Sequence, residues 1–278
     1  MSDPELLPPR NVGMPCLCRR DLLIGMACLP LLPPRSALAQ SSPVPDDTGR
    51  EAPWIVNCID DFPPYCFSIP GQGSGRLPAG LDVEIITALL EQAGAPYRFQ
   101  QMVWSRAMVQ LEQRQCDLLF GLVPSEQRLR DFLMVGPFRD GEIAFAARAD
   151  SSLTFNTLED LTGLVIGTAQ RNHYGAAFDT ATHFTRDPAR SDEFSLRKLA
   201  AGRIDLVVGD RLALAWKAKE LGVLDKIRFL PKPLSVSPHY IALPLDRQDK
   251  AQRLEVARQT LMANGAIGAI MERWRVTG

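Results

Sequence analysis

The sequence lacks the features by which several large classes of protein are recognised. Its 278 residues carry a formal net charge of −1, so it has no excess of the positive charge that nucleic-acid-binding surfaces need. Only three histidines are present, and neither they nor the cysteines stand at the C-x-x-C or H-x-x-x-H spacings of metal sites. We therefore expect no nucleic-acid partner, no metal ion and no cofactor.

Long apolar runs are also missing. No run reaches the roughly 18 residues that a membrane-spanning helix requires. A shorter apolar run at 22–32 follows Arg19-Arg20 and precedes Ala37-Leu38-Ala39, the arrangement of a secretory signal peptide. We predict a leader at 1–39, a flexible polar lead-in at 40–52 and a periplasmic mature protein. The segment from Arg19 also resembles a twin-arginine export signal, which leaves the export route open.

Cysteine becomes scarce once the leader is removed. Three of the six cysteines lie within the leader, which leaves Cys58, Cys66 and Cys116 in the mature chain. An exported protein can form disulfides, and three cysteines allow one bridge and one remaining thiol. If the strands that carry them are neighbours, Cys58–Cys116 is the expected bridge. Cys58–Cys66, which closes a short loop, is the alternative.

The remaining sequence alternates between the patterns of helices and strands. Residues 81–93 carry apolar side chains at helical spacing and end at Gly94, which predicts an amphipathic helix. Short apolar runs predict buried strands at 54–59, 97–101 and 117–120 and, in a second series, at 164–167 and 204–209. Such alternation is typical of an α/β protein with parallel sheets, here in two units.

One charged residue follows a predicted strand in each unit. Arg128 comes shortly after the strand at 117–120, and Asp210 ends the strand at 204–209. Ligands of open α/β sheets bind at the carboxyl ends of the strands, and a guanidinium can hold a carboxylate with two hydrogen bonds. A solvated surface arginine and a simple helix N-cap at Asp210 are the alternatives. The pair predicts a cleft between two lobes, with one charge on each wall.

Six motifs in order resemble the type II periplasmic solute-binding proteins, and specifically the polar amino-acid binders of ABC transporters (family 3). The motifs cover about residues 53–275. They are Gly80-Leu81-Asp82-Val83-Glu84-Ile85, Gln115-Cys116-Asp117-Leu118, Ser125-Glu126-Gln127-Arg128, Gly136-Pro137-Phe138, the run from Leu161 to Gly167, and the run from Ala201 to Asp210.

The resemblance implies a site and assigns its residues. Arg128, in the turn opened by Ser125, is expected to bind the α-carboxylate of an amino acid, and Asp210 its α-ammonium. Backbone donors of Gly121 and of the turn holding Asn172 and His173 are expected to complete the carboxylate site. A structural role is the alternative for His173, because a single histidine at a helix start is more often structural. The family's aromatic walls correspond to Phe62 and Trp104.

The resemblance also implies an architecture. It predicts a two-lobed α/β fold in which each lobe is a doubly wound, mainly parallel sheet and two hinge crossings join the lobes. Lobe 1 is expected to comprise 53–146 plus 240–278, and lobe 2 to comprise 147–239. The protein would act as a monomer that passes its ligand to an inner-membrane ABC permease, without enzymatic activity.

Two other functions are compatible with this fold. One is an enzyme like the cyclohexadienyl dehydratases, which would need an acid such as Glu142, Asp60 or Asp61. The other is an accessory partner of a periplasmic quinoprotein dehydrogenase.

One position departs from the pattern of the family, because Val123 stands where a hydroxyl side chain often binds the ligand carboxylate. That departure puts the usual amino-acid specificity in question.

Overall fold

The computed structural model describes residues 51–71, 76–170 and 172–276. The predicted leader (1–39) and nearly all of the lead-in (40–52) lie outside these residues. Among the residues described, no helix is long and apolar enough to cross a membrane.

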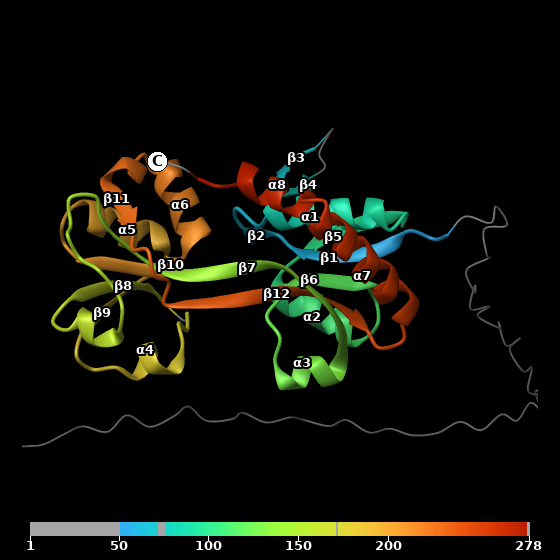
Figure 1. Cartoon of the computed structure of the whole chain (residues 1–278), viewed down its shortest axis with the longest axis horizontal. Helices are drawn as coiled ribbons and strands as arrows, with labels where there is room; N and C mark the ends of the chain where they lie inside the picture. Colours follow the sequence, from blue (N-terminus) through green and yellow to red (C-terminus); the bar gives the residue numbers. More distant parts are fainter. Residues whose placement is uncertain (1–50, 72–75, 171, 277–278) are drawn as a thin grey trace, which may run out of the picture. The chain divides into compact units, whose positions relative to one another are not determined.

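The order of the elements alternates strand and helix, as the sequence predicted (Figure 1). The strands are β1 (Trp54–Ile59), β2 (Asp61–Phe62), β3 (Cys66–Pro70), β4 (Arg76–Ala79), β5 (Tyr97–Met102), β6 (Leu118–Leu122), β7 (Phe132–Arg148), β8 (Val165–Ala169), β9 (Thr185–Ala189), β10 (Leu206–Asp210), β11 (Ile227–Phe229) and β12 (Ser235–Pro244). The helices are α1 (Leu81–Gln92), α2 (Trp104–Glu112), α3 (Glu126–Asp131), α4 (Ala176–Thr180), α5 (Asp192–Ala200), α6 (Arg211–Glu220), α7 (Gln248–Ala263) and α8 (Ala266–Arg273), with short 3₁₀ turns η1 (Leu158–Leu161) and η2 (Leu224–Lys226).

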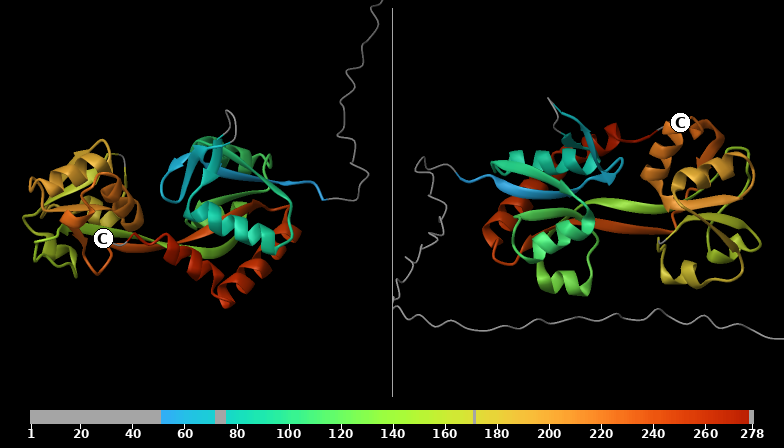
Figure 2. Two further views of the ribbon diagram at one scale, coloured as in Figure 1. Left: turned by 90° about the horizontal axis from the view of Figure 1, so that it is seen from above. Right: turned by 180° about the vertical axis from the view of Figure 1, so that it is seen from behind.

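Nine strands form one sheet in the order β5-β1-β6-β12-β7-β10-β8-β9, with β11 added beside β7. Pairings within each half are parallel where helices connect the strands, as in β1 with β5 and β8 with β9. The long strands β7 and β12 pair antiparallel with each other and run side by side between the two halves (Figures 1 and 2). The two crossings therefore merge the two expected sheets into one.

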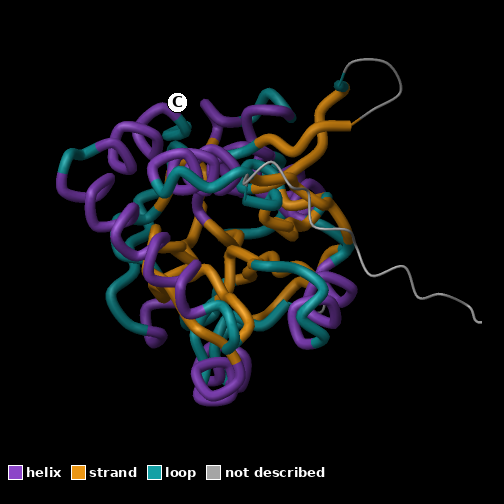
Figure 3. The backbone as a smooth tube through the Cα atoms, turned by 90° about the vertical axis from the view of Figure 1, so that its right-hand side faces the viewer, coloured by secondary structure: helices purple, strands orange, loops and turns teal. Residues whose placement is uncertain are grey.

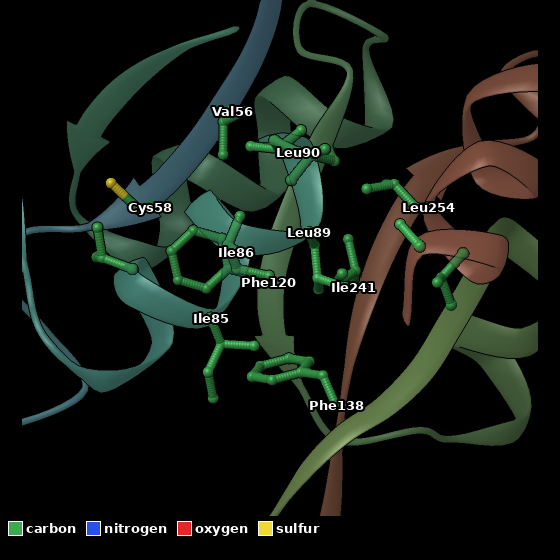
Figure 4. Close-up of a cluster of buried hydrophobic side chains, with 14 of the residues drawn as sticks. Val56, Cys58, Ile85, Ile86, Leu89, Leu90, Phe120, Phe138, Ile241 and Leu254 are labelled. Carbon is green, nitrogen blue, oxygen red and sulfur yellow. The ribbon is translucent and has the colours of Figure 1, made fainter. Parts of the chain in front are cut away.

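Alternation along the strands divides the core into layers. Val56 and Cys58 of β1 and Phe120 of β6 pack against α1, α7 and α8 (Figure 4), whereas Leu119 and Leu122 face α2. The half around β8 and β10 repeats the scheme with two further buried clusters. Because successive side chains of a strand point to opposite faces, one apolar strand supplies both layers. Figure 3 shows the helices lying around the strands. We call the half around β1 and β6 lobe 1 and the half around β8 and β10 lobe 2.

The predicted bridge between Cys58 and Cys116 is wrong in this structure. All three described cysteines are buried free thiols. The strands are neighbours, as assumed, and Val56 of β1 lies opposite Leu118 of β6. Cys58 follows Val56 by two residues, whereas Cys116 precedes Leu118 by two. At about 3.3 Å per residue in parallel strands, this offset places the two cysteines about 13 Å apart along the sheet, too far for a disulfide.

Candidate ligand-binding site

Lobe 1 contains a small, mostly apolar cavity of about 330 Å³, which we call the aromatic pocket. Three residues proposed from the sequence, Phe62, Trp104 and Gly121, line it. The complete lining is Ile59, Phe62, Tyr65, Cys66, Asp82, Trp104, Phe120, Gly121, Arg139 and His239.

Strand topology explains why residues distant in the sequence meet in this pocket. Strands β1, β5 and β6 are parallel and adjacent, so their carboxyl ends lie at one edge of the sheet. Phe62 follows β1, Trp104 follows β5, and Gly121 lies near the end of β6. Gly121 has φ 85°, and a Cβ there would lie 3.7 Å from Asp82 Oδ2. The pocket is therefore in the position where α/β sheets bind ligands.

A buried ion pair between Asp82 and Arg139 closes one side of the aromatic pocket. Arg139 Nη2 donates to Asp82 Oδ2 at 2.8 Å, and Arg139 Nε donates to Oδ1. The two side chains are only 1% and 4% exposed. The guanidinium carbon also lies 3.9 Å from the centre of the Tyr65 ring. Two of the five N–H donors of Arg139 are thus paired with Asp82, and its face is covered by Tyr65.

Burial and charge act in opposite directions on this pair. Burial raises the pKa of the Asp82 carboxyl, and the Arg139 charge offsets only part of that effect. Burial alone would lower the pKa of Arg139, but Asp82 raises it above its usual value. The two-point geometry is that of an ionised pair, because a guanidinium matches both oxygens of a carboxylate.

Asp210 reaches the same region from lobe 2. Its Oδ1 accepts the backbone N–H of Ala213 at 2.9 Å and the Tyr65 hydroxyl at 2.7 Å. Burial raises the pKa of the Asp210 carboxyl, and the two hydrogen bonds counteract this. The aspartate therefore caps α6 and also links the two lobes through a residue that lines the aromatic pocket.

Arg128 lies beside the aromatic pocket rather than in it. Its guanidinium carbon is 6.0 Å from the centre of the Trp104 ring, and Nη1 donates to the Val123 carbonyl at 2.6 Å. Ser125 Oγ accepts the Arg128 backbone N–H at 3.3 Å, so the serine caps α3. Both residues line a separate hollow of about 470 Å³. Trp104, which lines the aromatic pocket, is thus also a neighbour of Arg128.

The structure does not bring Asn172 and His173 to the aromatic pocket. Both are exposed in lobe 2, and His173 Nδ1 lies 3.5 Å from Asp179 Oδ2. The helix that follows this turn, α4, begins at Ala176. The role of these two residues in ligand binding stays a prediction.

Sequence reasoning missed several residues of the pocket. Asp82 belongs to the motif at the start of α1, and Arg139 follows Gly136-Pro137-Phe138, so both stood next to recognised patterns. Tyr65 also lines the pocket, and its hydroxyl donates to Asp210. His239 lines the pocket as well; burial and the Arg139 charge lower its pKa to about 4, so it is neutral near pH 7. In the part of the chain that the structure describes, no group of residues could hold a metal ion.

Two lobes around a shared sheet, with a pocket at the strand ends, define a ligand-binding protein of the periplasmic-binding-protein fold. A family model for the bacterial extracellular solute-binding proteins, family 3, matches residues 55–277. The chain belongs to this family. No curated protein matches it.

Solved structures share the fold. A probable amino-acid ABC transporter extracellular-binding protein from Bacillus subtilis, ytmK, is 19% identical over 81% of this chain and 98% of its own, with a TM-score of 0.69. A histidine kinase sensor domain with similarity to periplasmic binding proteins is 25% identical over 81% and 96%, with a TM-score of 0.60. An amino acid ABC transporter substrate-binding protein from Streptococcus pneumoniae, bound to L-arginine, is 14% identical over 80% and 93%, with a TM-score of 0.58.

Proposed function

We propose that this protein binds an amino acid or a similar small zwitterion between its lobes and delivers it to an inner-membrane ABC permease. One observation carries the proposal: opposite charges flank a single aromatic pocket. Arg128 lies beside Trp104, which forms one wall of the pocket, and Asp210 contacts Tyr65 on another wall. A zwitterion needs one cation and one anion at a fixed separation, and aromatic walls can bury the rest of the ligand.

Lobe closure would complete this site. Arg128 belongs to lobe 1 and Asp210 to lobe 2, and the lobes share the strands β7 and β12. Hinge motion along such crossings is a common way for two lobes to close on a ligand. A ligand ammonium at Asp210 could replace or join the Tyr65 hydroxyl. We propose that the closed monomer is the form that the permease recognises, and that the protein works in the periplasm.

The enzymatic alternative gains no support from the candidate acids. Glu142 is engaged by Arg211, whose Nε donates to Glu142 Oε2 at 2.6 Å. Asp60 and Asp61 are exposed and line a wide hollow of about 940 Å³ outside the aromatic pocket. We therefore propose a binding protein without catalytic activity. The role of accessory partner to a dehydrogenase likewise gains no specific observation.

A thermal-shift screen of the mature protein against the amino acids and small organic acids tests this function. A ligand that binds only the folded state stabilises it by RT ln(1 + [L]/Kd), about 2.7 kcal/mol at a hundredfold excess over Kd. Arg128→Ala should abolish the shift. Arg130→Ala is the matched control, because Arg130 lies on the same short helix and pairs with the exposed Glu126. A flat screen of folded, ligand-free protein, or equal losses in both variants, would contradict the proposal.

A further inference from the structure

Two buried thiols meet beside the aromatic pocket. Cys58, in β1, and Cys66, at the start of β3, are 0% and 1% exposed and belong to the same buried cluster. Figure 4 shows Cys58 within that cluster. The Cys66 thiol donates to the Ile59 carbonyl oxygen at 2.9 Å, and Ile59 directly follows Cys58 in the chain. Contact with Cys58 is the largest cause of the raised pKa of Cys66.

The third cysteine has no share in this contact. Cys116 packs in the cluster on the α2 side of the sheet, with Leu119 and Leu122. Its register offset from Cys58 separates the two along the sheet, as described above. Cys58 and Cys66 are thus the only two of the three described cysteines that the fold brings together.

The segment between the two thiols carries part of the pocket wall. Phe62 and Tyr65 both lie between Cys58 and Cys66, and Cys66 itself lines the pocket. Phe62 pairs with Cys66 in the short β2–β3 ladder. The rings of Phe62 and Tyr65 stack, with their centroids 5.1 Å apart. A covalent link at its base would close this wall segment into a small ring.

We propose that Cys58 and Cys66 form a disulfide bond in the exported protein, with Cys116 left as a free thiol. The oxidant is the disulfide of a thiol–disulfide oxidoreductase or of oxidised glutathione. One cysteine thiolate attacks that disulfide and forms a mixed disulfide, which the other cysteine then resolves. The two thiols lose two electrons and two protons, and the oxidant disulfide becomes two thiols.

Burial decides when this reaction occurs. In the folded protein both sulfurs are covered and the Cys66 thiol has a raised pKa, so little reactive thiolate is present. The bond therefore forms during folding, before β3 closes over β1. Once formed, it is shielded from reductants by the same packing. The inference depends on exposure to an oxidant and not on the identity of the ligand.

Peptide mapping tests the proposal. Mature protein is denatured and reduced, refolded in a glutathione redox buffer, denatured again without reductant and alkylated. It is then digested with an endoproteinase that cleaves before aspartate, because Asp60 and Asp61, but no Lys or Arg, lie between Cys58 and Cys66. We expect one alkylated cysteine, Cys116, and one linked pair of peptides containing Cys58 and Cys66. Cys116→Ser should keep the linked pair, whereas Cys66→Ser should leave Cys58 and Cys116 both alkylated.

Two results would overturn the proposal. One is alkylation of all three cysteines in protein that has regained its native circular dichroism. The other is a linked peptide that contains Cys116.

The same mapping on the full chain, expressed so that its own leader is used, should give the Cys58–Cys66 pair when the protein is recovered from the periplasmic fraction. Ligand binding is measured separately, so failure of the disulfide leaves the proposed function untouched.

Discussion

The buried pair of Asp82 and Arg139 gives the sharpest prediction of stability. Each side chain is almost completely buried, and the described contacts of the Asp82 carboxylate are both made by Arg139. Replacing Asp82 with Leu leaves a guanidinium in an apolar site without its counter-charge. Breaking a buried pair in this way costs about 3–5 kcal/mol. Replacing both partners removes both desolvation penalties, and such changes are often neutral or stabilising.

Thermal and urea unfolding of Asp82→Leu, Arg139→Met and the double variant measure this coupling. For a protein of this size a change of 1 kcal/mol shifts Tm by about 2–4 °C. We therefore expect each single variant to lose roughly 6–20 °C, and the double variant to recover most of that loss. Loss of a negative charge near the start of α1 adds less than about 1 kcal/mol to the effect of Asp82→Leu.

An exposed ion pair supplies the control. Arg148 Nε lies 3.3 Å from Asp150 Oδ1, with the two side chains 36% and 84% exposed. Asp150→Asn should change stability by less than about 1 kcal/mol, because water screens such pairs. The reasoning is refuted if Asp82→Leu is no worse than Asp150→Asn. It is equally refuted if the double variant loses the sum of the two single losses.

Three further predictions follow from single contacts. Asp210→Asn keeps a good N-cap for α6 but removes the negative charge that we propose binds the ligand ammonium. Titration calorimetry should therefore show affinity reduced roughly tenfold to 150-fold with Tm nearly unchanged, and unchanged affinity would contradict the assignment. Gly80→Ala should destabilise the protein by more than about 2 kcal/mol, because φ at Gly80 is 129° and the added Cβ would clash with the Tyr65 carbonyl oxygen. The control Gly222→Ala, at φ 64° in open space, should cost only about 1 kcal/mol. Equal losses in urea unfolding would show this account to be wrong. The pKa of His239 in the folded protein, about 4, lies below its ordinary 6.5, so its contribution to stability is present above pH 6.5 and is lost as pH falls toward 4. His239→Asn should flatten this pH dependence of the unfolding free energy by up to about 3 kcal/mol. An unchanged pH profile would contradict this role of His239.

Much of the pocket was predictable because it depends on strand ends. The apolar runs that became β1, β5 and β6 were visible in the sequence, and parallel pairing fixes which of their ends meet. Phe62, Trp104 and Gly121, which the family resemblance had named, all lie at or near those strand ends. The two lobes were likewise implied by motifs spread along nearly the whole chain.

The buried charge pair could not be predicted in the same way. Arg139 lies in the middle of β7, a strand of 17 residues of which the sequence motifs mark only Gly136-Pro137-Phe138. Its partner Asp82 is 57 residues away, on the first turn of α1. No local periodicity relates two such positions. Only the packing of α1 against the sheet makes them neighbours, and packing is decided by the whole core.

The two arginines near the pocket differ in what they can still bind. Arg139 is inside the aromatic pocket, but both oxygens of Asp82 and the face of Tyr65 already engage it. A ligand carboxylate could take Arg139 only by leaving Asp82 buried and unpaired, which is costly. Arg128 is partly exposed and makes only one side-chain hydrogen bond among the described residues, to the Val123 carbonyl. Its planar fork of donors is otherwise available. If the protein binds a carboxylate as proposed, Arg128 is therefore the better ligand of the two arginines.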